Sequence, residues 1–245
     1  MNFPHTLRRL AALAAVATVA GLGNAHAADF DTIGLLNQAE FRAFSEDLAA
    51  AVSYKGMIPS EGLGITGFDL GLSAGATAGA HRDLQPKAAG GGSVPEQVPV
   101  VGARLVKGLP FDIDIGVVGL SLPGTNVEAL GGELRWAFIG GNTVVPAVAL
   151  RLSTMSVSGV EGLKMRASGA DLSISKGFAL FTPYAGVGLV DVRSSAPGST
   201  LGDENYRLNK TFVGLNIALT PLALVLEADR TGGATSYGVK VAVRW

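Results

Sequence analysis

The residues that could carry out acid–base chemistry are few in this sequence of 245 residues. It has three histidines and no cysteine, which excludes cysteine nucleophiles, cysteine-ligated zinc and disulfide frameworks. Two of the histidines fall in a leader described below. The third, His81, lies beside Arg82 and Asp83, with Ser93 further along the same stretch rich in glycine and alanine. A lone histidine in such a loop is expected to be a solvated side chain rather than a general base.

Two pairs of carboxylates remain as candidates for catalysis: Asp112 with Asp114, and Glu227 with Asp229. Residues i and i+2 of a β-strand share a face, so such pairs also arise from strand alternation alone. The sequence has no phosphate-binding loop, no nucleophile-elbow motif and no His/Cys cluster for a metal ion. We therefore expect no catalytic residue, no bound metal and no cofactor, and the protein is predicted not to be an enzyme.

The composition is apolar and poor in charge. Hydrophobic residues make up 48% of the chain and charged residues 16%, with 34 glycines, a net charge of −1 and a mean hydropathy of +0.36. So few charges exclude a disordered chain and make an ordinary soluble surface difficult to build. The small net charge argues against nucleic acid as a partner.

Residues 1–27 have the pattern of a secretory signal peptide. Two arginines precede an apolar run over 10–22, and Ala25-His26-Ala27 gives the small-x-small pattern of a cleavage site. The run is short for a transmembrane helix, which needs about 20 residues. We expect cleavage after Ala27 and export across the inner membrane.

From residue 63 onward, apolar and polar residues alternate. Ten segments of this kind follow, and each is long enough for a tilted strand that crosses a bilayer, which needs about 9–11 residues. They are residues 64–77, 98–107, 111–120, 126–139, 143–157, 162–175, 178–192, 205–218, 222–231 and 235–245. Short connections alternate with a set that includes two long loops, as in bacterial outer-membrane barrels. The predicted fold is all-β: a closed antiparallel transmembrane β-barrel of about ten strands over 63–245.

Charged residues in these segments lie on the strand face opposite to the apolar side chains. In 222–231, for example, Leu224 and Leu226 share one face, and Glu227 and Asp229 share the other. A soluble barrel would point the apolar face inward, whereas a membrane barrel has the reverse arrangement, which the scarcity of charge favours. The predicted lumen charge network consists of Asp69, Arg104, Asp112, Asp114, Glu133, Arg135, Arg151, Asp171, Lys210, Glu227, Asp229, Lys240 and Arg244.

This near-balanced set predicts ion pairs across a narrow lumen. We expect Arg104 to reach Asp112 or Asp114 across a short turn, and Lys240 to reach Glu227 on the neighbouring strand.

Keeping the charges on one face also predicts the turns. A two-residue Gly232-Gly233 turn places Asp229 opposite Ser236, and a Thr220-Pro221 turn places Ala218 opposite Ala223. Between 126–139 and 143–157, a two-residue turn would put Arg151 on the apolar face, so a three-residue loop over 140–142 is predicted.

Apolar residues recur at helical spacing from Ile33 to Val52, which predicts an amphipathic helix over 32–52 with Asp31 or Thr32 as its N-cap. This helix could be a lid across the periplasmic mouth, a plug in the lumen, or a helix on the membrane surface. Its acidic character disfavours an anionic lipid surface, so lid or plug is favoured. Residues 28–62 are thus predicted to form a periplasmic-side helix and linker.

The last strand ends on an aromatic residue. Trp245 follows apolar side chains at every second position back to Tyr237. The pattern resembles the terminal signal that the barrel-assembly machinery reads in outer-membrane proteins, with Trp245 in place of the more common phenylalanine. The positions of this predicted signal are Tyr237, Val239, Val241, Val243 and Trp245.

The region 63–245 as a whole resembles small Gram-negative outer-membrane β-barrel proteins. The stretches FDTIGLLNQAEFRAFSEDLAAAVSY (30–54), LGITGFDLG (63–71), LSISKGFALFTPYAGVG (172–188) and EADRTGGATSYGVK (227–240) are similar to an uncharacterised proteobacterial outer-membrane family. That resemblance implies no activity or site residues. The omptin proteases and lipid A deacylases are similar in architecture only.

The sequence therefore predicts a non-catalytic protein of the cell outer membrane, either structural or a narrow, gated, porin-like passage for small solutes, with outer-membrane lipid and the barrel-assembly machinery as partners. Two alternatives stay open. One is an outer-membrane enzyme or adhesin that acts through loops 79–97 and 194–204. The other is a soluble periplasmic β-barrel that binds an apolar ligand.

Overall fold

The computed structural model describes residues 29–30, 32–91 and 96–245. The predicted signal peptide, its cleavage site after Ala27, the proposed cap Asp31 and Ser93 lie outside these residues. The elements in chain order are η1 (Ile33–Leu35), α2 (Gln38–Val52), β1 (Phe68–Ala78), η2 (Arg82–Leu84), α3 (Gln85–Ala88), β2 (Val98–Gly108), η3 (Pro110–Asp112), β3 (Ile113–Ser121), β4 (Glu128–Ile139), β5 (Ala147–Ser158), β6 (Lys164–Ser175), β7 (Phe181–Ser195), β8 (Glu204–Leu219), β9 (Leu222–Thr231) and β10 (Ala234–Arg244).

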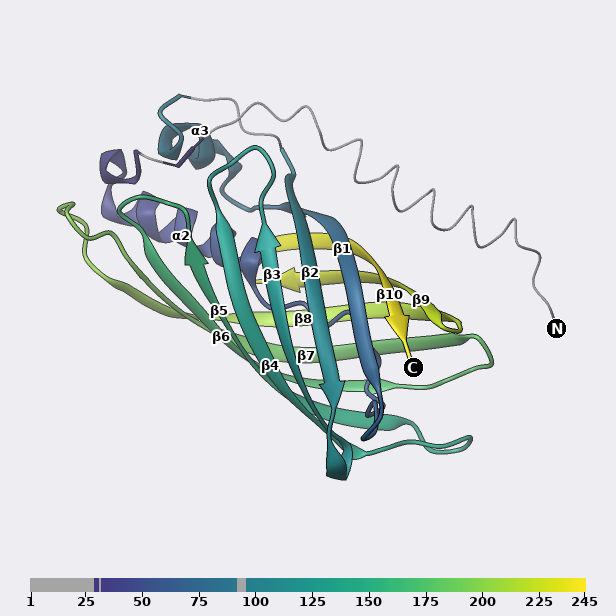
Figure 1. Ribbon diagram of the computed structural model, residues 1–245. Coiled ribbons are helices and arrows are strands. Elements are labelled where there is room, and N and C mark those ends of the chain that lie inside the picture. Colours follow the sequence, from purple (N-terminus) through teal and green to yellow (C-terminus); the bar gives the residue numbers. More distant parts are fainter. Residues whose placement is uncertain (1–28, 31, 92–95) are drawn as a thin grey trace.

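The ten strands form a closed antiparallel barrel in which each strand pairs with its neighbours in sequence and β1 pairs with β10 (Figure 1). At this seam Phe68 and Trp245 exchange backbone hydrogen bonds of 2.9 and 3.2 Å. Closure leaves no strand edge without a partner. The predicted fold class and strand number are confirmed.

Loops at the two ends of the barrel differ in length. The long-loop end carries the connections 79–97, 122–127, 159–163, 196–203 and 232–233; the short-turn end carries 109–112, 140–146, 176–180 and 220–221, together with the start of β1 and the end of β10. The Gly232-Gly233 and Thr220-Pro221 turns set the predicted pairs Asp229 with Ser236 and Ala218 with Ala223.

The predicted three-residue loop over 140–142 is wrong, because the connection spans seven residues, 140–146. The Asn142 side chain accepts hydrogen bonds of 2.8 Å from the backbone N–H groups of Val144 and Val145, which closes a wider turn. A register shift between Trp136 and Ile139 then keeps Arg151 on the luminal face.

Side chains near the short-turn end have the polarity of a membrane barrel. On β6, Asp171, Ser173 and Ser175 point into the lumen and are buried, whereas Leu172 and Ile174 point outward and are each 47% exposed. The outward large apolar residues form an apolar band around the wall. The band includes Leu70, Leu72, Leu105, Ile115, Val117, Leu134, Trp136, Leu150, Leu152, Leu172, Ile174, Val187, Leu189, Val213, Leu226 and Val243. This is the arrangement of a transmembrane β-barrel.

Toward the long-loop end the polarity is reversed. On β6 the outward residues become Lys164, Arg166 and Ser168, and the inward residues become Met165 and Ala167. The same change occurs along β5, β7 and β8. The expectation that the strand charges face the lumen is therefore wrong here, since Asp191 and Arg207 also lie outside and form an exposed ion pair of 2.7 Å.

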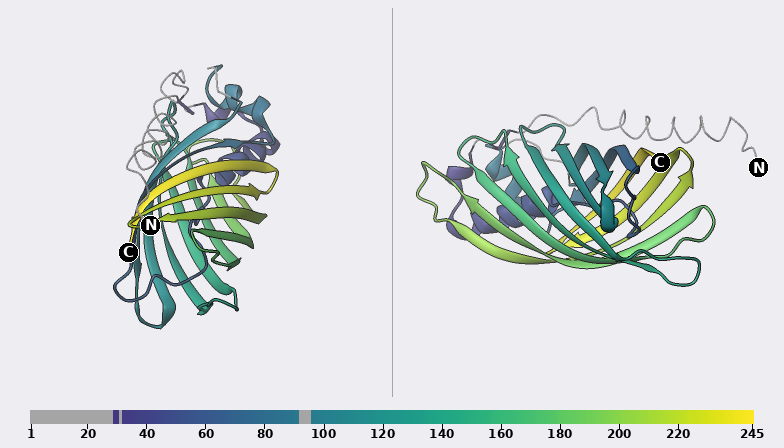
Figure 2. Two further views of the ribbon diagram at one scale, coloured as in Figure 1. Left: turned by 90° about the vertical axis from the view of Figure 1, so that its right-hand side faces the viewer. Right: turned by 60° about the horizontal axis from the view of Figure 1, so that its bottom comes forward.

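Helix α2 explains the apolar interior of this end, because it lies within the barrel there and packs against the wall (Figure 2). Its Phe41, Phe44 and Leu48 join wall residues such as Met165 and Val192 in one buried cluster. Ser45 Oγ lies 3.0 Å from Ser194 Oγ on β7. The predicted lid at the short-turn mouth is therefore wrong, because α2 lies inside the barrel at the other end.

The N-cap of α2 is Asn37 rather than Asp31 or Thr32. The Asn37 side chain accepts from the Glu40 backbone N–H at 3.0 Å, and the Glu40 carboxylate accepts from the Asn37 N–H at 2.8 Å. No helix in the described ranges is long and apolar enough to cross a membrane.

Candidate functional site

The candidate site is the lumen together with residues 53–67, here called the luminal segment, which joins α2 to β1. It has no regular secondary structure, and it runs from the long-loop end to the short-turn end. An irregular segment in a protein interior needs partners for its backbone N–H and C=O groups. The charged residues of the wall supply many of them.

Cations of the wall donate to carbonyl groups of the luminal segment. Lys210 Nζ donates to the Tyr54 carbonyl, and Arg104 donates to the Gly56 carbonyl. Arg135 donates to the carbonyl groups of Pro59 and Glu61, the latter at 3.1 Å.

Carboxylates of the wall accept from its N–H groups in turn. Glu227 accepts from Met57 N–H at 2.9 Å, and Asp114 accepts from Leu63 N–H at 3.0 Å. The wall charges therefore hold the segment through its backbone, and these contacts do not depend on the identity of its side chains.

Ion pairs complete the lumen network. The Asp114–Arg135 pair (2.6 Å) and the Asp69–Lys240 pair (2.7 Å) are fully buried. Further pairs join Arg151 to Glu133 (2.7 Å) and Asp171 (3.6 Å), Lys210 to Asp171 (3.7 Å), and Arg244 to Asp69 (2.6 Å). Two neighbouring wall arginines, Arg135 and Arg151, face each other in the β4–β5 ladder, and each has its own carboxylate partner.

Of the thirteen residues predicted for the lumen, eleven are buried inside the barrel. Arg244 lies at the short-turn rim with its side chain 19% exposed. The prediction that Asp112 faces the lumen is wrong, because Asp112 is exposed in η3. Phe111 and Asp112 both take positive φ values, and the strand begins only at Ile113.

Two predicted pairs are also wrong. Arg104 reaches the luminal segment rather than Asp112 or Asp114, since Asp114 is bound by Arg135 on the adjacent strand. Lys240 binds Asp69 across the β1–β10 seam rather than Glu227.

Residues of the luminal segment and of β7 that the sequence pattern did not indicate complete the site. Lys55 Nζ binds Asp229 at 2.7 Å, and Ser60 Oγ donates to Ser173 Oγ at 2.9 Å. Tyr184 donates its hydroxyl to Glu227 at 2.7 Å. The signal for Lys55 was an isolated cation in a linker that leads into a lumen lined by charged residues.

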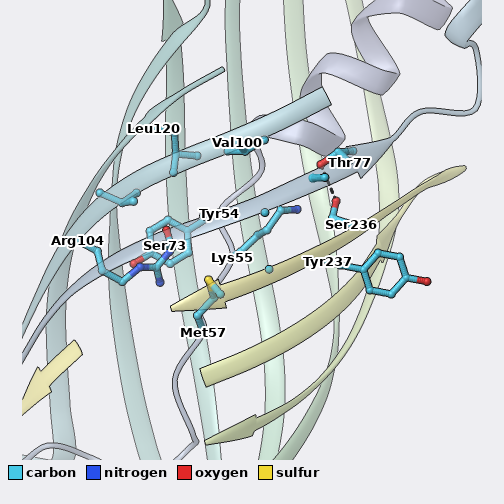
Figure 3. A pocket seen from close by; sticks show the side chains of 15 residues that line it. Tyr54, Lys55, Met57, Ser73, Thr77, Val100, Arg104, Leu120, Ser236 and Tyr237 are labelled. Atoms are coloured by element: carbon cyan, nitrogen blue, oxygen red, sulfur yellow. Dashed lines mark hydrogen bonds between the residues drawn. The ribbon is translucent and has the colours of Figure 1, made fainter. Parts of the chain in front are cut away.

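Little free space remains beside the luminal segment. Figure 3 shows a cavity between the segment and strands β1, β2, β3 and β10, with Tyr54, Lys55, Met57 and Arg104 on its sides. Its volume is about 30 Å³, which is room for about one water molecule. The segment thus occludes this part of the lumen.

His81 is held at the long-loop end and is not freely solvated. The Asp47 carboxylate of α2 accepts from the backbone N–H groups of Ala80 (2.9 Å) and His81 (2.7 Å), and His81 Nδ1 lies 3.4 Å from Asp47 Oδ1. This contact ties loop 79–97 to the helix. Within the residues described, no group of three or more His, Cys, Asp or Glu side chains is placed to hold a metal ion.

Loop 79–97 is also fastened by an ion pair at the surface. Lys87 Nζ of α3 lies 2.7 Å from Glu40 Oε1 of α2, and this hydrogen bond lowers the pKa of the Glu40 carboxyl below its ordinary value. The contact is therefore complete at neutral pH and is lost in acid, as the pH falls through the lowered pKa.

A close approach at Gly56 gives a test of how tightly the lumen is filled. A Cβ atom at this position would overlap the buried Arg151 guanidinium, which its carboxylate partners hold in place. We expect Gly56→Ala to lower the free energy of unfolding by about 1–3 kcal/mol. Gly119→Ala, where a Cβ atom meets nothing within 4 Å, is the control. Urea titration measures both, and equal stability of the two variants would contradict a filled lumen.

The comparisons with known proteins concern the fold. No protein-family model matches the chain, and no curated protein sequence matches it. The N-terminal β-barrel domain of Pseudomonas aeruginosa OprF is 12% identical, with 74% of this chain and 99% of that chain covered and a TM-score of 0.38.

Two further solved structures are similar. The KdgM porin in complex with disordered oligogalacturonate is 7% identical, covers 72% of this chain and 99% of its own, and has a TM-score of 0.41. Neisserial surface protein A is 12% identical, with 73% and 94% covered and a TM-score of 0.31. The assignment of the fold rests on the closed strand ladder and the apolar band described above.

Proposed function

We propose that this protein is a non-catalytic barrel of the outer membrane that its own N-terminal segment closes at rest. The observation that carries this proposal is the set of hydrogen bonds between wall charges and the backbone of the luminal segment, notably at Gly56, Met57 and Leu63. The apolar band supports a place in a bilayer, and the alternation of long loops and short turns supports the outer membrane.

Membrane fractionation tests whether the apolar band of the barrel lies in a bilayer. The protein should stay in washed membranes in urea, leave them only with detergent, and run faster on a gel before boiling than after it. The mature chain should begin at Ala28, which mass spectrometry determines. Release by urea without detergent would contradict membrane integration.

A narrow gated passage is the second candidate, because the wall beneath the luminal segment is lined by charged side chains such as Arg104, Arg135 and Glu227. In a planar bilayer we expect the full chain to carry no current. A variant that lacks 30–62 should conduct if the lumen is a passage, provided that it retains the gel mobility of a folded barrel. If the variant is folded but carries no current, the lumen is not a passage and only the structural role remains.

An enzyme or adhesin acting through the long loops receives no support from the described contacts. His81 and Asp47 connect a helix to a loop through the backbone, which is a structural role. We expect cells that carry the His81→Ala variant to show the same phenotype as cells that carry the unchanged protein.

The C-terminal strand is proposed to be the signal for the barrel-assembly machinery. Tyr237 and Trp245 point outward, 62% and 61% exposed, while Lys240 and Ala242 between them are buried. The Trp245 ring lies 5.2 Å from Phe68, so it also supports the seam. We expect Trp245→Ser to lower the yield of heat-modifiable protein in cells, and Trp245→Phe to restore it. Equal yields of all three proteins would contradict the signal.

A further inference from the structure

Three basic residues on the outer wall form what is here called the cationic patch: Lys164 and Arg166 on β6, and Arg193 on β7. All three are exposed, and they lie at the long-loop end of their strands, beyond the apolar band. A groove of about 500 Å³ runs between them, with Ser156, Asn205 and Asp203 also on its sides.

The patch places like charges against each other. Arg166 lies directly opposite Arg193 in the β6–β7 ladder, an arrangement that is unfavourable for two cations on their own. Within the described part of the chain, neither arginine is within ion-pair distance of a carboxylate, although Asp203 borders the groove. The neighbouring Arg207 differs, because it forms a direct ion pair with Asp191 at 2.7 Å, whereas Asp191 attracts Arg193 only from beyond ion-pair distance. The contrast points to an anion from outside the chain.

The position of the patch identifies the kind of anion. Along β6 the outward residues pass from Lys164 and Arg166 through Ser168 to Ala170, Leu172 and Ile174. At about 3.3 Å per residue, Arg166 lies about 13 Å from Ala170 along the strand. A lipid whose acyl chains cover the apolar band would place its headgroup at this height. An apolar concavity of about 670 Å³, bordered by Leu172, Val187 and Val213, lies on the same wall.

We propose that the cationic patch binds the phosphorylated headgroup of a membrane lipid whose acyl chains lie on the apolar band of β6–β8. This inference rests on the proposed membrane position of the barrel, and it adds a specific ligand class and two arginines that recognise it. Paired guanidinium groups suit a phosphate because they can donate several hydrogen bonds to its oxygens.

The test uses the full mature chain in detergent, with lipid binding measured by native mass spectrometry. The probes are lipid A carrying two phosphates, its dephosphorylated form, and phosphatidylcholine. We expect the phosphorylated probe to bind more tightly than the other two. The double variant Arg166→Gln/Arg193→Gln should bind it about thirtyfold more weakly, since each basic side chain near an anionic surface contributes about fivefold.

The control Arg82→Gln/Lys176→Gln removes the same charge from places outside the patch and should bind as the unchanged protein does. Equal weakening in both double variants, or no preference for the phosphorylated lipid, would overturn the proposal. Displacement of the lipid by inorganic phosphate at equal concentration would also overturn it, because the apolar band would then contribute nothing. Heat-modifiable mobility verifies that each variant is folded. Urea extraction of the unchanged protein reports separately on the membrane position.

Discussion

Replacing Arg135 by methionine is expected to lower the free energy of unfolding by about 3–5 kcal/mol, because it breaks a buried ion pair and leaves one charge behind. The Arg135 side chain is fully buried, and its Nε and Nη2 atoms lie 3.0 and 2.6 Å from Asp114 Oδ2. It also donates to the carbonyl groups of Pro59 and Glu61. Its loss therefore affects the wall and the luminal segment together.

Urea titration of the refolded protein in lipid vesicles measures this effect. Arg207→Met is the control, since Arg207 pairs with Asp191 on the exposed outer wall, where water screens the ion pair and its loss should change stability little. The double variant Asp114→Asn/Arg135→Met should recover part of the stability, because no uncompensated charge remains. Equal stability of the Arg135 and Arg207 variants would contradict a buried lumen network.

The second large effect is expected on the outside of the wall. Leu172 on β6 belongs to the apolar band, so Leu172→Arg should cost about 2–4 kcal/mol in a bilayer, the range for a cation on the lipid face near mid-membrane. Ser168→Arg lies four residues along the same strand on the same outward face, beyond the change in polarity. There the cost should fall to about 0–1 kcal/mol.

The pair of variants separates membrane from water as the surroundings of β6, because both introduce the same side chain on the same face. Folding yields into vesicles, compared between the two, give the result. A soluble barrel would tolerate an outward arginine at either position, so equal yields would contradict the membrane placement of the band.

Much of the wall could be predicted from sequence, because alternation with a period of two forces each strand to separate its faces. The pairs across Gly232-Gly233 and Thr220-Pro221 follow directly, since a two-residue turn leaves no freedom in register. The start of β1 was predicted four residues too early, at 64 rather than Phe68, because the luminal segment continues the apolar pattern without pairing as a strand.

The reversal of inward and outward polarity along the strands was harder to predict from the sequence. The inward side chains of β7 change from Tyr184 and Gly186 to Val190 and Val192 along one unbroken strand. Alternation alone does not say which face is inside, and it predicts a single orientation along each strand. Only the position of α2 explains why the same inner face must become apolar.

The capping box at Asn37 could have been predicted from the sequence. An asparagine three residues before a glutamate, at the start of a segment with apolar residues at helical spacing, is a known pattern. The partners of the lumen charges could not be predicted from the sequence. Five of these charges contact the backbone of 53–67, and backbone groups are the same in every sequence, so no residue type in the segment indicates these partners.

A cross-link between the luminal segment and the wall tests the occluded lumen most directly. Ser60 Oγ lies 2.9 Å from Ser173 Oγ, which suits replacement by a disulfide, and the chain has no other cysteine. We predict that Ser60→Cys/Ser173→Cys forms a disulfide in the assembled barrel, whereas Ser60→Cys/Ser168→Cys, with the second cysteine on the outer face of the same strand, does not. If both thiols of the first variant stay free and react with a water-soluble maleimide, the segment does not lie where the structure places it, and the barrel is not closed by its own N-terminus.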